Sequence, residues 1–185
     1  MHLLNTIDSM VDKTFDVTHM IAQHVCLTTI DVLTGIYNRD FLWNEIDNVL
    51  DFIHLTQKAA TTRIVNPFLW SDFIYALTQK GKELQLKYNC FIKTFEALKN
   101  KDVIAGNKDD IYSLIDQINK LRQYDSTIND ITPIHELLGF LIAGYETSAL
   151  TIIAALFFMG VDEEVQNKAR EEIKLIFEEN KNEDL

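Results

Sequence analysis

One stretch of the sequence limits the possible folds more than any other. From Leu137 to Val161 the chain has 25 residues with a single charged side chain, Glu146. By hydropathy alone, a run of this length could cross a bilayer as a helix. A carboxylate near the middle of a membrane span is costly, however, and no basic cluster flanks either end of the run. The run therefore favours a long helix buried on all sides within an α-rich protein, with an integral membrane helix as the alternative.

The composition supports a mainly α fold. The 185 residues include only 6 Gly and 2 Pro, which leaves few turns and disfavours a many-stranded β fold. Hydrophobic residues make up 47% and charged residues 24% of the chain, which excludes a disordered or collagen-like protein. The formal net charge of −11, with no basic stripe, excludes nucleic acid as a partner.

Apolar residues at three- and four-residue steps predict a series of amphipathic helices. The predicted helices cover residues 16–33, 41–62, 80–101, 109–122, 132–161 and 162–185. Gly35 is expected to end the first helix, and Asn66, which precedes a proline, the second. Asp109 or Asp110 is expected to cap the fourth helix. No linker rich in Pro, Gly or Ser divides the chain, so residues 1–185 are predicted to form a single domain.

Residues 66–78 form an apolar and aromatic connector between the second and third predicted helices. The connector carries the large side chains of Phe68, Leu69, Trp70, Phe73, Ile74 and Tyr75. So much apolar surface in a connector has to cover something. Two interpretations stay open, a loop packed on the core and a roof over a ligand chamber.

Glu146 and Thr147 stand beside a stripe of small residues within the long helix. The stripe recurs at intervals of four and consists of Gly139, Ala143, Thr147 and Thr151. Such a stripe lets a flat group or another helix backbone come close. A buried carboxylate beside a hydroxyl can relay protons, and the Thr147 hydroxyl can also bond the Ala143 carbonyl one turn back. The residues alone leave open a proton relay and a packing seam with a satisfied Glu.

The cysteines and histidines show no metal-binding spacing. Cys26 and Cys90 are far apart and predict two reduced thiols rather than a disulfide framework. The five His are scattered, and no His-Glu-x-x-His or glycine-rich phosphate loop occurs. We therefore predict no metal site made by the chain's own residues and no directly bound nucleotide.

The residues around the Glu-Thr pair resemble a known family. Ala143-Gly144-Tyr145-Glu146-Thr147-Ser148 resembles the central-helix signature of the cytochrome P-450 haem-thiolate monooxygenases, (Ala/Gly)-Gly-x-(Asp/Glu)-Thr-(Thr/Ser). Three further segments are similar to that family in the same order, namely residues 15–17 with 29–35, residues 66–78, and residues 164–168 with 170–173. The connector is most similar to the roof loop of insect members of the fatty-acid-hydroxylase branch. The resemblance covers essentially the whole chain.

The resemblance implies a cofactor, partners and roles for individual residues. The cofactor would be haem, with Ala143, Gly144 and Thr147 facing it. Thr147 would hold dioxygen through its hydroxyl, and Glu146 would supply protons. The substrate would be a small apolar molecule (a fatty acid, hormone or xenobiotic), and a separate NADPH-dependent reductase would supply electrons. The residues in contact with substrate would be Phe68, Leu69 and Phe73. The enzyme would lie on the cytosolic face of the endoplasmic reticulum membrane, held by an anchor absent from this chain.

The chain also departs from the family's pattern. No cysteine follows Cys90, so the thiolate that would ligate the haem iron is absent, as is the family's Glu-x-x-Arg pair. Glu163 stands where proline is usual, and Ala143 stands where some relatives carry a Glu bonded to the haem. We therefore expect residues 1–185 to be a partial domain, the helical middle of the fold, that is inactive alone and exposes apolar faces. A non-catalytic, all-helical binding or scaffold protein derived from the same fold is the alternative.

Overall fold

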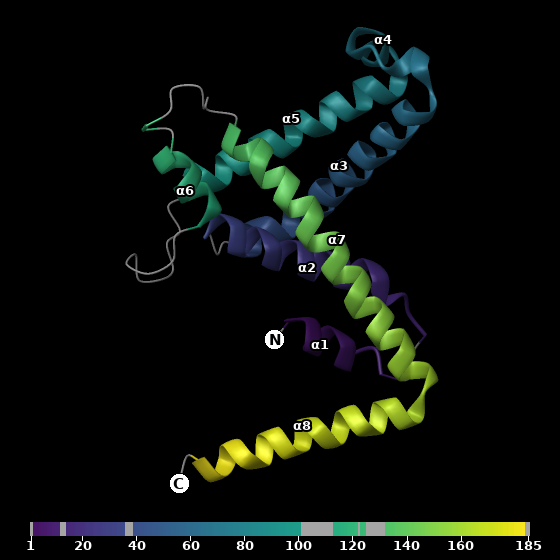
Figure 1. The fold of residues 1–185 in the computed structure, drawn as a ribbon, viewed down its shortest axis with the longest axis vertical. Helices are drawn as coiled ribbons and strands as arrows, with labels where there is room; N and C mark the ends of the chain where they lie inside the picture. Colours follow the sequence, from purple (N-terminus) through teal and green to yellow (C-terminus); the bar gives the residue numbers. More distant parts are fainter. Residues whose placement is uncertain are drawn as a thin grey trace.

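A computed structural model describes residues 2–11, 14–35, 39–100, 113–121, 123–124 and 132–183. Within these ranges every regular element is a helix, which confirms the predicted mainly α fold (Figure 1). The elements are α1 (His2–Asp8), α2 (Val17–Thr34), α3 (Arg39–Val65), the 3-10 helix η1 (Pro67–Leu69), α4 (Asp72–Leu77), α5 (Gln79–Asn100), α6 (Leu114–Leu121), α7 (Thr132–Val161) and α8 (Glu163–Glu183).

Local capping chemistry sets the ends of the first long helices. Asp16 accepts a hydrogen bond from the Thr18 amide at 2.8 Å and begins α2. Gly35 ends it in the left-handed region (φ 66°), donating its N–H to the Asp31 carbonyl at 2.9 Å. Helix α3 ends at Val65, as predicted, because the following Asn66 precedes a proline.

Helix α6 begins later than the sequence predicts. Its first residue is Leu114, and the Ser113 hydroxyl accepts from the Asp116 amide at 3.2 Å while donating to the Asp116 carboxylate at 2.8 Å. The Ser113 hydroxyl thus satisfies one of the free amides in the first turn of α6, as an N-cap side chain does. The expected caps Asp109 and Asp110 lie outside the described residues.

The core lies where α7 crosses α2 and where α3 and α5 run side by side (Figure 1). Its buried residues come from α2, α3, α5 and α7 and are Cys26, Leu27, Ile30, Leu42, Ile46, Val49, Leu50, Phe52, Ile53, Phe91, Phe95, Leu98, Leu137, Leu141 and Tyr145. Helix α5 is amphipathic as predicted, since Phe91, Phe95 and Leu98 are buried in this core while other positions of the helix are exposed. The helices thus form one continuous apolar core.

The prediction that α7 is buried on all sides is wrong for the described residues. A single stripe at four-residue spacing is buried, consisting of Pro133, Leu137, Leu141, Tyr145 and Ala149. The exposed apolar residues on the same helix are Phe140, Leu150, Ile152, Leu156, Phe157, Phe158 and Val161. The reason is that α2 and α6 pack against α7 while α8 turns away from the bundle (Figure 1). By length and composition, Pro133–Val161 is also the one described helix that could cross a membrane.

Candidate active site on helix α7

The middle of α7 carries the acid and the alcohol that the sequence singled out. The Thr147 hydroxyl donates to the Ala143 carbonyl at 2.8 Å, as predicted, and the Thr151 hydroxyl donates to the Thr147 carbonyl at the same distance. Each hydroxyl proton is therefore used within the helix. The Thr147 oxygen consequently presents its lone pairs, and acts as a hydrogen-bond acceptor toward the face on which it lies.

The small residues of α7 form an open face. Gly139, Ala143, Thr147 and Thr151 are all exposed. A Cβ added at Gly139 would meet no atom of the described residues within 4 Å. The stripe is therefore an accessible surface in the described structure rather than a helix-packing seam.

Gly144 lies on a different side of α7. A Cβ at this position would approach Cγ2 of Thr29, on α2, to 3.2 Å. That distance is tighter than ordinary van der Waals contact, so the glycine serves the close approach of α2 and α7. Of the three residues expected to face a cofactor, the structure thus brings Ala143 and Thr147 together and places Gly144 apart.

The expectation of a buried Glu146 is wrong, because its side chain is exposed. The carboxylate is nevertheless held, since Gln57 on α3 donates from Nε2 to Oε2 of Glu146 at 2.5 Å. The neighbouring Tyr145 hydroxyl shares a hydrogen bond of 3.2 Å with Nε2 of His54, one turn earlier on α3. These paired contacts fix α3 against α7 at the acid. Gln57 and His54 are not among the predicted site residues. The only sequence pattern that marks them is two polar residues one turn apart on α3.

Burial governs the titration of the groups beneath this site. It raises the pKa of the Cys26 thiol to about 12. The pKa of Tyr145 is also raised to about 12, chiefly by burial and then by the proximity of Cys26 and Glu146. Cys26 is therefore protonated and inert at neutral pH, whereas Cys90 is exposed on α5. In the ranges that the structure describes, no group of three or more His, Cys, Asp or Glu side chains could hold a metal ion.

The connector lies at a different part of the structure from the open face of α7. It folds as η1 and α4 beyond the far end of α3 and α5 (Figure 1). Phe68 and Phe73 are 83% and 73% exposed, Leu69 is partly buried, and only Tyr75 among the connector residues is buried. The interpretation of a loop packed on the core is therefore wrong for most of the segment. The structure does not bring the predicted substrate residues to Thr147.

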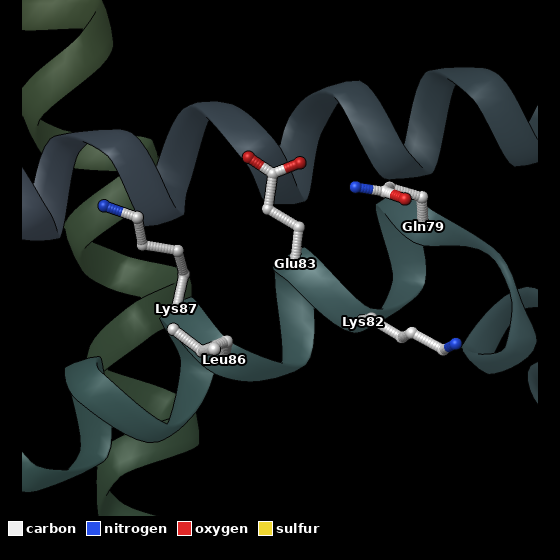
Figure 2. Close-up of a pocket in the computed structure, with 5 residues that line it drawn as sticks. All are labelled: Gln79, Lys82, Glu83, Leu86 and Lys87. Carbon is white, nitrogen blue, oxygen red and sulfur yellow. The ribbon is translucent and has the colours of Figure 1, made fainter.

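A groove along α5 contains none of the predicted site residues. Its volume is about 480 Å³, and its lining residues are Gln79, Lys82, Glu83, Leu86 and Lys87. Figure 2 shows Glu83 and Lys87 pointing from α5 toward α3. Lys87 is used in holding the two helices together, because its Nζ lies 3.0 Å from Oδ2 of Asp51. The groove is a feature of the helix pairing and brings no reactive group together with the acid and alcohol of α7.

Comparison with known proteins identifies the family of the chain. The cytochrome P450 family model matches residues 1–185, and the chain belongs to that family. It is similar to Cytochrome P450 6j1 of Blattella germanica, at 34% identity over 140 residues. The match covers 74% of this chain and 27% of the relative, so the chain spans about a quarter of the length of that curated relative. No solved structure matches the chain.

Proposed function

We propose that this chain forms the oxygen-activating helical part of a haem monooxygenase and that Glu146 and Thr147 act as its acid–alcohol pair. The observation that carries this proposal is the open face of α7. Ala143 and Thr147 lie exposed on that face, and a side chain built at Gly139 would meet empty space among the described residues. A flat cofactor such as haem fits against small side chains of this kind. When bound, haem supplies the one-electron chemistry of dioxygen.

The side chains of α7 have distinct parts in this proposal. Because the Thr147 hydroxyl proton is given to the Ala143 carbonyl, its oxygen accepts a hydrogen bond from water or another protonated group. Glu146 is exposed and can exchange protons with solvent, while Gln57 holds one of its oxygens. The pair can therefore hold a water and deliver a proton to the open face. Gly144 has a packing role, because the absence of a side chain there allows α2 to approach α7 closely.

The wider reaction follows from the same family membership. We infer an apolar substrate of the fatty-acid, hormone or xenobiotic class, in contact with Phe68, Leu69 and Phe73. The exposure of the two phenylalanine rings supports this role, because exposed apolar rings are free to contact an apolar ligand. Electrons would come from an NADPH-dependent reductase, with the enzyme on the cytosolic face of the endoplasmic reticulum membrane. Residues 1–185 are one partial domain in this proposal and are inactive alone. Cys26 is buried and protonated, and Cys90, although exposed, lies within helix α5 and not at the position of the family's haem-ligating cysteine.

A chimeric enzyme tests the proposal. Residues 1–185 replace the corresponding segment of Cytochrome P450 6j1, and product formed per NADPH consumed is measured with dodecanoic acid as the probe. We expect Thr147→Ala and Glu146→Gln to lower this ratio about tenfold, with the difference appearing as peroxide. Thr151→Ala is the matched control, because its hydroxyl makes the same bond to the preceding turn without a proposed catalytic role. Unchanged coupling in both test variants would remove the pair from the mechanism.

A further inference from the structure

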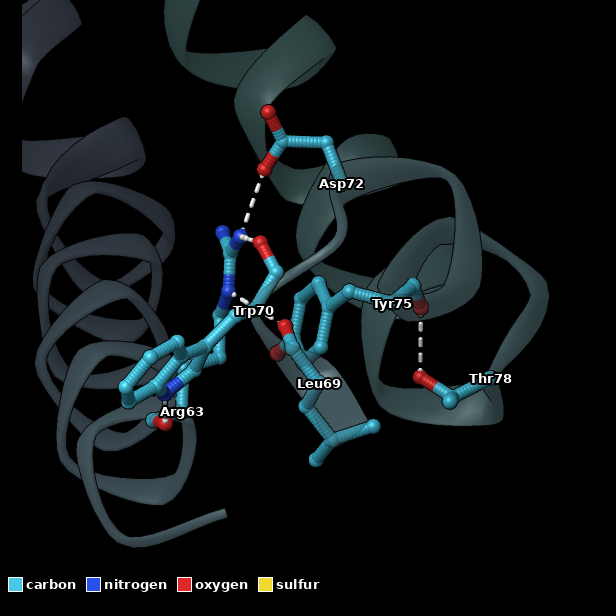
Figure 3. Close-up of polar contacts among 6 residues, drawn as sticks. All are labelled: Arg63, Leu69, Trp70, Asp72, Tyr75 and Thr78. Atoms are coloured by element: carbon cyan, nitrogen blue, oxygen red, sulfur yellow. Dashed lines mark hydrogen bonds and ion pairs between the residues drawn. The ribbon is translucent and has the colours of Figure 1, made fainter. Parts of the chain in front are cut away.

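The side chain of Arg63, in the last turn of α3, binds the connector through several polar contacts (Figure 3). Its Nε donates to the Leu69 carbonyl at 2.9 Å, and its Nη2 donates to the Trp70 carbonyl at 2.7 Å. The same Nη2 lies 2.6 Å from Oδ1 of Asp72, and the guanidinium lies 5.1 Å from the centroid of the Tyr75 ring. In return, the Trp70 indole donates to the Arg63 carbonyl at 2.7 Å. The contacts run in both directions between the helix end and the connector.

Apolar burial does little to hold the middle of the connector. Phe68, Trp70 and Phe73 are 83%, 63% and 73% exposed. Burial stabilises a side chain only in proportion to the area removed from water, so these rings gain little from packing. Tyr75 is buried, and its ring is the one under the Arg63 guanidinium. The polar contacts of Arg63 are thus what fixes the path of this segment.

The two ends of the connector are fixed separately. At the first end, the Asn66 carboxamide oxygen accepts from the Phe68 amide at 3.2 Å. At the second end, the Thr78 hydroxyl donates to the Tyr75 carbonyl at 2.7 Å and accepts from the Gly81 amide at 3.0 Å. A Cβ at Gly81 would collide with the Tyr75 carbonyl, so only glycine permits this corner. Between these ends, the backbone at Leu69 and Trp70 is held by hydrogen bonds from Arg63.

We propose that Arg63 is a positioning residue for substrate binding. By fixing the backbone at Leu69, between Phe68 and Phe73, it sets the directions in which these three side chains point. This inference rests on the proposed function, in which the same three side chains contact an apolar substrate. Arg63 itself does not touch the substrate.

The geometry of the guanidinium distinguishes this role from simple charge pairing. Asp72 has a side chain 91% exposed, and ion pairs with such groups contribute little. The Leu69 and Trp70 carbonyls are served by two nitrogens of one planar fork, which lysine cannot reproduce with a single ammonium. Arg63→Lys keeps the charge beside Asp72 and loses the fork. Asp72→Asn does the reverse, and is the matched control.

The first test measures, without any cofactor, how well the contacts of Arg63 protect the connector from local opening. The chain has 2 Trp, so Trp43→Phe leaves Trp70 as the sole indole. In that background we expect Arg63→Lys to raise the acrylamide quenching constant of Trp70 about twofold, because the connector opens locally more often. Arg63→Gln is the second variant, with the same expectation, and Asp72→Asn should leave the constant unchanged. Equal quenching in all folded variants, as judged by circular dichroism, overturns the proposal.

The second test uses the haem-loaded chimeric enzyme with dodecanoic acid. We expect Arg63→Lys to raise KM about tenfold at constant kcat, whereas Asp72→Asn changes neither. An unchanged KM overturns the positioning role and leaves the monooxygenase proposal standing, since Thr147→Ala tests that proposal through coupling. Failure of the parent chimera to turn over dodecanoic acid overturns the proposed function and this inference with it.

Discussion

The hydrogen bond between Gln57 and Glu146 can be measured as a coupling energy. It joins α3 to α7 across 89 positions of sequence, with Nε2 and Oε2 at 2.5 Å. Hydrogen bonds to a charged partner contribute about 1.5–3 kcal/mol when well enclosed. Glu146 is exposed and Gln57 is partly buried, so solvent screening reduces the expected coupling to about 1 kcal/mol. We expect this coupling energy to be stabilising, because removal of either partner replaces the hydrogen bond between the two side chains with a hydrogen bond to water.

A double-mutant cycle isolates this energy. Gln57→Ala, Glu146→Ala and the double variant are unfolded in urea and followed by circular dichroism. The double variant should be about 1 kcal/mol more stable than the sum of the single effects predicts, because the bond can be lost only once. Gln57→Ala combined with Glu172→Ala, on the distant α8, is the control pair and should be additive within about 0.5 kcal/mol. Such cycles detect a coupling energy down to about 0.3 kcal/mol. A smaller value for Gln57 and Glu146 would refute the claim that Gln57 holds the Glu146 carboxylate.

Two further predictions concern the thiol groups and the alkaline limit of stability. Purified residues 1–185, given haem, reductant and carbon monoxide, should show no thiolate-type Soret band. Cys26 is buried and protonated, and Cys90 lies within helix α5 and not at the position of the family's haem-ligating cysteine; a thiolate band lost in Cys90→Ala would contradict this. Stability in urea should fall as the pH rises above 9, because Cys26 and Tyr145 hold their protons to about pH 12 when folded and release them earlier, from 9.0 and 10.0, when unfolded. Cys26 accounts for about 1.4 kcal/mol per pH unit in that window, and a flat profile to pH 11 would contradict its burial.

Features that depend on a few neighbouring residues could be predicted from the sequence. Gly35 ends α2 with a positive φ, and Asn66 marks the end of α3, because each effect arises within one turn of the chain. The bond from Thr147 to the Ala143 carbonyl is equally local, since it spans four residues of one helix. The acid and alcohol themselves were also identified from the sequence.

Features that depend on how helices cross could not be predicted. The partner of Glu146 is Gln57, 89 positions away, and no local pattern specifies which turn of α3 meets α7. The extent of burial of α7 was wrong for a related reason. Hydropathy reports which side chains favour an apolar environment, whereas exposure depends on which neighbours are present, and Leu141 and Leu150 differ only in that respect.

The signature on α7 divides its residues among separate neighbours. Gly144 meets Thr29 on α2, Glu146 reaches Gln57 on α3, and Thr147 lies on the open face. Successive residues of a helix are rotated by about 100°, so adjacent positions address different surroundings. A short motif can therefore combine close packing, an anchored carboxylate and an accessible hydroxyl without one requirement compromising another. It follows that a larger side chain at Gly144 should disturb the packing of α2 against α7. Loss of the Thr147 hydroxyl, to which we assign a part in proton delivery, should leave that packing intact.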